Sequence, residues 1–305
     1  MKELPKINQL KNLRAIINHG GVRLAAQALG QTQPAITRSI NELERVLGTR
    51  LFLRGESGVI LTKTGTAFEA RMNLILNELE RAVDEVKQIE QVSHGEVAFG
   101  CSHFPAFDII PELINDFKSQ HKEARITVIE GQFSELASAL RMGKLDFFIG
   151  NTLNLSSREF ISEHLMTLEF CIMGRKGHPL KYCNSLSELQ GAKWFLPAVT
   201  AGYYINIEGL IFPHGDIDEG TVIYGDSLSI GRMLVLEHDY LFAGPKYMMT
   251  ESSYQEIVEI IPVSEQLPDG HYSLAYRKSH ILTPIAEKLI QIIRSTYNDL
   301  FPKQS

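Results

Sequence analysis

Residues 22–47 of the 305-residue chain read VRLAAQALGQTQPAITRSINELERVL. This stretch predicts two short helices joined at Gly30-Gln31, because Thr32 is a favourable N-cap and Pro34 suits the first turn of a helix. Apolar residues recur through the second helix at spacings of four, three and four, and therefore share one face: Ile36, Ile40, Leu43 and Leu47. Two helices around a glycine turn, with a buried stripe behind a polar face, are typical of a helix-turn-helix.

The polar face of the second helix carries small or hydrogen-bonding side chains that suit base edges and phosphates. We expect these residues to contact DNA: Thr32, Gln33, Pro34, Ala35, Thr37, Arg38 and Asn41. Residues 50–54 and 59–61 then read as two strands around the turn Gly55–Gly58, a hairpin of the size of a wing. Arg50 and Arg54 are placed to meet phosphate or the minor groove. The alternative for residues 22–47 is an ordinary helical pair in a core, and the hairpin makes it less favourable.

The N-terminal segment resembles LysR-type transcriptional regulators. The residues that carry the resemblance are Ala25-Ala26, Gln33-Pro34-Ala35, Ile40, Leu43-Glu44, Gly48, Leu51-Phe52, Arg54 and the run 61–65 (LTKTG). The segment departs from the commonest pattern at Gly20-Gly21-Val22-Arg23, which affects only the entry to the helix-turn-helix. The resemblance extends more loosely along the whole chain. It implies a dimer, or a tetramer built from two kinds of dimer contact, and a small metabolite bound between two C-terminal lobes.

Charge is distributed unevenly along the chain. Residues 1–65 carry ten Lys/Arg and four Asp/Glu, whereas the rest carries twenty and thirty-two, within an overall net charge of -6. A basic N-terminal module on an acidic body fits a DNA contact confined to one end.

Composition and motifs exclude several classes of protein. Hydrophobic content of 44% with 22% charged residues is ordinary for a soluble protein, and no apolar run or signal-peptide pattern suggests a membrane or export. We therefore expect a cytoplasmic protein. The three cysteines form no CxxC pair, and the ten histidines show no metal-ligand spacing, so we expect no metal and no cofactor. Cys101-Ser102-His103 places reactive side chains together, but no nearby carboxylate orients His103, and we expect no catalytic residues and no enzyme activity.

A long helix is predicted from Thr62 as N-cap to about Val92. Its apolar residues repeat with heptad-like spacing: Phe68, Met72, Leu76, Leu79, Val83 and Val86. The alternative is a surface helix that packs on its own domain. We favour a dimerisation helix, because a single helix-turn-helix reads too few base pairs to bind tightly, and a dimer reads two half-sites of an inverted repeat.

After a hinge at residues 93–96, strands and helices alternate as in α/β proteins with a parallel sheet. Strands are predicted at 97–100, 125–130, 145–150, 165–174, 193–197, 221–224, 239–243, 257–261 and 272–276. Helices are predicted at 109–118, 133–142, 185–190, 203–212, 227–237 and 284–300, with another starting near Pro105. We expect residues 1–65 to form a winged helix-turn-helix, 66–92 the linker helix and 93–305 a two-lobed domain like periplasmic binding proteins. Lobe I takes about 95–164 and 271–305, and lobe II about 165–270.

Ligands of open α/β sheets bind beyond the carboxyl ends of the strands. The residues predicted to bind the effector follow such strand ends: Ser102, His103, Phe104, Gln132, Phe133, Asn151, Thr152, Thr200, Gly202, Tyr203 and Tyr204. These segments offer hydrogen-bond donors rather than acids, which favours a small organic anion, in our interpretation a carboxylate with a planar or apolar body. The alternative for each residue is a loop, capping or packing role.

Two functions fit these patterns. The first is a DNA-binding transcriptional regulator controlled by a small molecule, which is expected to bind a specific duplex in a salt-dependent way. The second is a two-lobed binding protein or enzyme dimerised by its N-terminal helices, which is expected to show no such binding. The hairpin, the charge asymmetry and the long helix favour the first.

Overall fold

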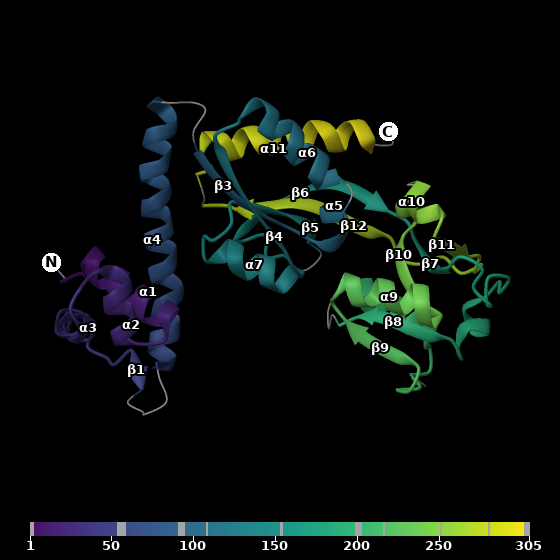
Figure 1. Cartoon of the computed structure of the whole chain (residues 1–305), viewed down its shortest axis with the longest axis horizontal. Coiled ribbons are helices and arrows are strands. Elements are labelled where there is room, and N and C mark those ends of the chain that lie inside the picture. The colour runs from purple at the N-terminus through teal and green to yellow at the C-terminus, as the bar shows by residue number, and fades with distance from the viewer. Residues whose placement is uncertain are drawn as a thin grey trace.

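The computed structural model describes residues 3–53, 59–90, 95–107, 109–152, 155–198, 203–215, 217–250, 252–279 and 281–301. Figure 1 shows a small helical domain at the N-terminus, one long helix, and two α/β lobes beyond it. In the described part of the chain, no helix is both long and apolar enough to cross a membrane.

The N-terminal domain consists of three helices and a hairpin: α1 (Ile7–His19), α2 (Val22–Leu29), α3 (Gln33–Leu47), β1 (Phe52–Leu53) and β2 (Ile60–Leu61). The hydroxyl of Thr32 accepts a hydrogen bond from the Ala35 amide at 3.4 Å and caps α3, as predicted. Gly30 ends α2 at φ 63°, a left-handed conformation that suits glycine. Ile36, Ile40 and Leu43 of the predicted stripe are buried and Leu47 is half-buried against the same core, so the opposite face of α3 is left to solvent.

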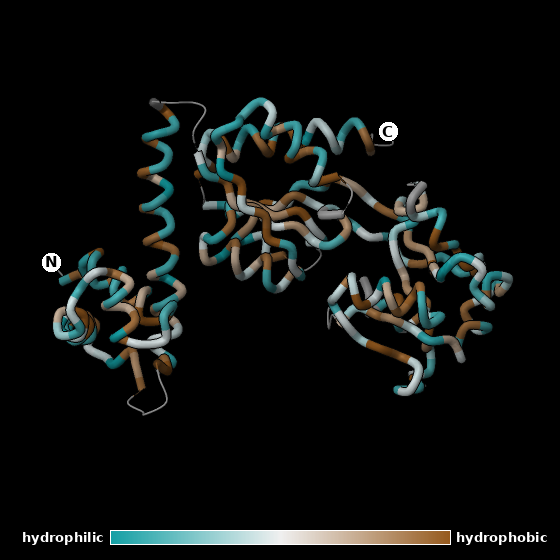
Figure 2. Tube along the Cα trace, viewed as in Figure 1, coloured by the Kyte–Doolittle hydropathy of each residue, from teal (hydrophilic) through white to brown (hydrophobic). Residues whose placement is uncertain are grey.

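The long helix α4 (Lys63–Glu90) starts where the sequence predicts, with the Thr62 hydroxyl accepting the Gly65 amide at 2.9 Å. Figure 2 shows apolar segments recurring along it between hydrophilic ones.

The predicted apolar seam divides into two parts. Met72 and Leu76 are buried in the core of the N-terminal domain, and Phe68 packs against that core. This corrects their assignment to a free dimerisation face. Leu79, Val83 and Val86 lie further along and are 42%, 52% and 61% exposed.

One side of α4 is fixed to its own lobe I by polar contacts. Arg81 Nη2 lies 3.0 Å from Asp146 Oδ1, and the other oxygen of this buried carboxylate accepts the Ala98 amide at 2.8 Å. Arg277 pairs with Glu78 on the same side of the helix. These two ion pairs attach the middle of α4 to lobe I.

Lobe I is built on a five-stranded sheet. Its strands, in spatial order, are β4 (Ala124–Glu130), β3 (Gly95–Cys101), β5 (Phe147–Asn151), β12 (Gly270–Arg277) and β6 (Phe160–Leu168). One face packs against α6 (Ile109–Gln120) and α11 (Pro284–Leu300), and the other against α7 (Phe133–Arg141), as Figure 1 shows. The short helix α5 (His103–Phe107) follows β3 directly.

Lobe II contains a second five-stranded sheet. Its strands, in spatial order, are β11 (Val258–Ile261), β7 (Phe170–Arg175), β10 (Tyr240–Pro245), β8 (Lys193–Pro197) and β9 (Val222–Gly225). Its helical segments are η1 (Leu186–Leu189), α8 (Tyr203–Ile211), α9 (Leu228–His238), η2 (Lys246–Thr250) and α10 (Ser252–Gln255).

The sheets differ from the sequence expectation in two respects. Both are mixed rather than parallel, because β12 runs antiparallel to β5 and β6, and β7 runs antiparallel to β10 and β11. The single strand predicted at 165–174 is two strands, β6 in lobe I and β7 in lobe II, which are separated at Glu169. The chain therefore leaves lobe I at residue 169, a few residues later than expected.

Candidate nucleic-acid interface and ligand cleft

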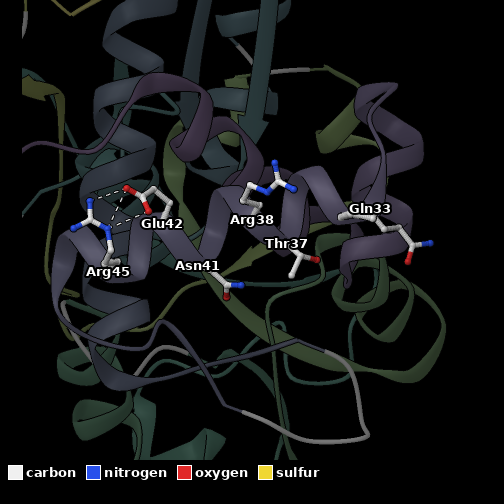
Figure 3. Close-up of a pocket in the computed structure, with 7 residues that line it drawn as sticks. Gln33, Thr37, Arg38, Asn41, Glu42 and Arg45 are labelled. Atoms are coloured by element: carbon white, nitrogen blue, oxygen red, sulfur yellow. Dashed lines mark hydrogen bonds and ion pairs between the residues drawn. The ribbon is translucent and has the colours of Figure 1, made fainter.

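The solvent face of α3 is an open surface lined by polar side chains. A shallow depression there is formed by Gln33, Pro34, Thr37, Arg38, Asn41, Glu42 and Arg45. Figure 3 shows Gln33, Thr37 and Asn41 at successive turns of α3, with Arg38 beside them. Thr32 and Ala35 are also exposed at the start of the helix. All seven residues predicted at the start and on the polar face of α3 are therefore exposed on one side of the helix. Their spacing would let this side of the helix follow a DNA groove.

The second half of this face contains an ion-pair cluster that sequence reasoning missed. Arg45 Nη2 lies 2.7 Å from Glu42 Oε1 and 3.0 Å from Glu3 Oε2. The hydrogen bond from Arg45 lowers the pKa of Glu42, and the two carboxylates raise the pKa of Arg45. Sequence spacing could have indicated this cluster, because Glu42 follows Arg38 by four residues and Arg45 follows Asn41 by four, which places them on the same face of the helix. Two carboxylates of the protein therefore engage Arg45, and Arg38 is the other cation that lines this depression.

The base of the hairpin is fixed to α3 by a buried carboxylate. Glu44 is 9% exposed, and its Oε1 accepts the amide of the fully buried Leu51 at 2.7 Å. Its Oε2 lies 3.3 Å from Arg50 Nη1, while the Arg50 side chain remains 60% exposed. The Arg50 guanidinium is therefore held beside α3 and remains open to solvent. Arg54 lies outside the described residues.

The two lobes approach each other at strand ends. Gln132 Nε2, at the N-cap of α7, donates to Asp226 Oδ2 of lobe II at 3.3 Å. Asp226 directly follows β9, and Gln132 lies two residues beyond β4. This contact crosses between the carboxyl ends of parallel strands in the two lobes, the position predicted for a ligand.

Ser102 has the surroundings of a ligand-binding hydroxyl. Its Oγ is buried and has no hydrogen-bond partner in the described part of the chain. Its amide donates to the Ile149 carbonyl at 2.9 Å, which fixes the loop after β3. A Cβ at Gly150 would lie 3.2 Å from the Ser102 Oγ, so glycine leaves room beside the hydroxyl. An unpaired buried hydroxyl is unfavourable unless a ligand or water satisfies it.

His103 has a carboxylate partner, contrary to the sequence expectation. His103 Nδ1 contacts Glu130 Oε1, because Cys101 and Glu130 pair across β3 and β4. Ser102 Oγ and His103 Nε2 both lack a hydrogen-bond partner among the described residues, so they are not bonded to each other. A serine nucleophile with a histidine base is therefore not assembled here. Glu130 and Asp226 also show that the cleft contains acids, which the sequence reasoning missed.

The other predicted cleft residues are distributed between the cleft and its surroundings. Phe104 is 9% exposed and packs edge-on against Tyr247 at 6.0 Å, so it belongs to the packing between the lobes rather than to the cleft surface. Phe133 packs on Phe148, and the Thr152 hydroxyl meets Ser162 at 3.0 Å. Asn151 is half-buried.

The residues predicted from lobe II can be located only in part. Tyr203 and Tyr204 begin α8, as expected, but the placement of their side chains is outside the description. Thr200 and Gly202 lie outside the described residues.

Comparison with known proteins gives matches to both halves of the chain. The model of a bacterial regulatory helix-turn-helix protein, lysR family, matches residues 7–66. The model of a LysR substrate binding domain matches residues 90–298. The HTH-type transcriptional regulator TdcA of Escherichia coli K12 is 30% identical over 298 residues, which cover 97% of this chain and 95% of TdcA. The HTH-type transcriptional regulator GbpR of Azospirillum brasilense is 25% identical and covers 97% of this chain and 87% of its own.

Solved structures show the same fold at lower identity. CbnR, a LysR family transcriptional regulator, superposes with a TM-score of 0.69 at 19% identity, over 96% of this chain and 99% of CbnR. Full-length CbnR complexed with its target DNA superposes with a TM-score of 0.68 at 18% identity, over 95% of this chain and 99% of CbnR.

Proposed function

The chain belongs to the LysR family of DNA-binding transcriptional regulators with an effector-binding domain. On this premise we propose that it reads an inverted-repeat operator as a dimer or tetramer. We propose further that it binds a small organic monocarboxylate between its lobes. The alternative of a two-lobed binding protein or enzyme gives no reason for the match of residues 7–66 to a regulatory helix-turn-helix.

The exposed face of α3 is the observation that carries the DNA proposal. Gln33 can pair with an adenine edge, and Arg38 can pair with a guanine edge or a phosphate. The Arg50 guanidinium stands at the side of the helix, where a phosphate would lie. Two copies of α3 about 34 Å apart would read successive major grooves.

Fluorescence anisotropy with a labelled operator tests this assignment. Arg38→Ala is expected to weaken specific binding by about 1–3 kcal/mol. Arg125→Ala is the matched control, because Arg125 is also exposed but lies in lobe I, where it pairs with Glu96. Unchanged affinity for both Arg38→Ala and Gln33→Ala would show that another surface reads DNA.

The exposed apolar stripe of α4 supports assembly. Ile75, Leu79, Val83, Val86 and Ile89 are 42–70% exposed and recur at spacings of three and four. A stripe of this kind on one helix suits a second copy of the same helix, which would cover it and place two N-terminal domains side by side.

The niche at Ser102 supports a carboxylate ligand. The buried hydroxyl can donate to a carboxylate oxygen, and Gln132 and Thr152 add polar groups at neighbouring strand ends. Glu130 and Asp226 lie at the same cleft and disfavour a second negative charge, because like charges repel strongly outside bulk water. This favours a monocarboxylate over a dicarboxylate.

A thermal-shift screen of small carboxylates, followed by calorimetry, tests the effector assignment, since a bound ligand raises the melting temperature. Ser102→Ala is expected to lose affinity for the acid that the screen finds. Ser119→Ala is the control, because its hydroxyl donates to the Asp116 carbonyl on α6. Equal affinity in both variants would place the ligand elsewhere.

A further inference from the structure

Two histidines meet on the strands that connect the lobes. The Thr167 hydroxyl lies 3.2 Å from His164 Nε2 and 3.1 Å from His271 Nδ1. The two imidazole rings are 6.1 Å apart between centroids, at an interplanar angle of 57°. Two ring nitrogens from different strands therefore converge on one oxygen.

The pairing of β6 with β12 fixes this arrangement. Thr167 lies opposite His271, and His164 lies opposite Ser273, with an irregularity of register between them. Without that irregularity, the spacing of three residues from His164 to Thr167 would turn the two side chains to opposite faces of the sheet. The three side chains instead share one face, and all three are exposed to solvent.

We propose that His164 Nε2 and His271 Nδ1 bind a divalent transition-metal ion of the Zn²⁺, Ni²⁺ or Cu²⁺ class. Imidazole nitrogen suits these ions, with metal–nitrogen distances of about 2.1 Å. Two imidazoles on one tetrahedral ion have ring centroids roughly 5.3 Å apart. The observed separation of 6.1 Å exceeds that value by about 0.8 Å.

The rest of the coordination sphere comes from outside the two rings. No cluster of three His, Cys, Asp or Glu side chains that could hold a metal occurs in the part of the chain that the structure describes. Water therefore supplies the remaining ligands, which the exposure of the cluster allows, and the Thr167 hydroxyl lies within reach of the ion. Such a site is open and exchangeable rather than structural.

The charge around the cluster favours a cation over an anion. Glu169 follows Thr167 by two residues, and Asp269 precedes His271 by two residues. The two acids therefore lie at the ends of the same two strands, β6 and β12. Lys246 pairs with Glu169 at 3.2 Å and offsets one of the two negative charges.

Metal binding at this position would join the strand that leaves lobe I to the strand that returns to it. β6 continues into β7 of lobe II, and β12 follows the return from lobe II. Both strands belong to the lobe I sheet, so a bound ion would join the outgoing and the returning segment on the lobe I side of the crossing.

Calorimetric titration of untagged, chelator-treated full-length protein with NiCl₂ at pH 7.5 tests the site. One equivalent per chain is expected, with affinity in the micromolar range that falls as protons compete at lower pH. His164→Gln and His271→Gln are each expected to weaken binding at least tenfold. His238→Gln is the control, because His238 is exposed at the end of α9 in lobe II.

Electron paramagnetic resonance of the protein with one equivalent of Cu²⁺ gives a readout that does not depend on stability. The nitrogen couplings of two imidazoles are expected in the unaltered chain and of one imidazole in His271→Gln. Failure of the unaltered protein to bind Ni²⁺, or undiminished binding in both histidine variants, would overturn the proposal.

Discussion

Replacement of Glu44 tests how the recognition helix is attached to the wing. In Glu44→Ala the amide of Leu51 loses its acceptor at 2.7 Å, and water cannot replace it because Leu51 is fully buried. An unsatisfied buried N–H costs about 1–3 kcal/mol. The lost contact with the exposed Arg50 adds little, since surface pairs contribute about 0–1 kcal/mol. We therefore expect a loss of about 2 kcal/mol, local to the N-terminal domain.

Hydrogen–deuterium exchange of full-length protein measures this loss directly. A loss of about 2 kcal/mol lowers the protection of the Leu51 amide by roughly 30-fold. Glu44→Gln, which keeps an acceptor oxygen, is expected to restore much of it. Glu42→Ala is the matched control on the same helix, because the Glu42 side chain is 45% exposed and pairs only with Arg45 among the described residues. Equal protection in Glu44→Ala and Glu42→Ala would refute the reasoning.

Three further outcomes are expected. Leu79→Asp places a charge on the exposed stripe of α4 and is expected to reduce the particle mass in light scattering, and an unchanged mass would exclude this stripe as the interface. Burial raises the pKa of the Cys101 and Cys171 thiols to about 12, so a thiol reagent at pH 8 is expected to modify Cys183 before these two. Equally rapid reaction of all three thiols would contradict the burial of Cys101 and Cys171. The hydrogen bond from the Arg294 guanidinium lowers the pKa of Glu163. Glu163→Gln is therefore expected to lower the thermal midpoint at pH 7, and to have less effect as the pH falls below the ordinary glutamate pKa. An effect on the midpoint that grows on acidification would contradict this expectation.

Elements with local signals were predictable from the sequence. The helix α3 follows from the Thr32 cap, the proline in its first turn and the spacing of its apolar residues. The last helix, α11, runs over the predicted residues 284–300, with Pro284 in its first turn and apolar residues recurring along its buried face. These signals involve residues within one or two turns of each other, so they do not depend on the rest of the fold.

Features that depend on distant residues were not predictable in this way. The break at Glu169 lies between two strands with buried apolar residues, so the run reads as one strand, and only the separate pairing of β6 and β7 divides it. The apolar stripe of α4 does not specify its partner, and Met72 is buried in the N-terminal core rather than left exposed. His103 and Glu130 lie 27 residues apart and meet through the pairing of β3 with β4.

Selection of binding sites from a random duplex library with the full-length protein tests the central claim most directly. The account predicts enrichment of an inverted repeat, with affinity that falls as salt is raised and that is lost or redirected in Arg38→Ala. No enrichment of a common sequence, or the same enriched sequence at the same affinity in Arg38→Ala, would contradict the assignment of α3 as the helix that reads DNA.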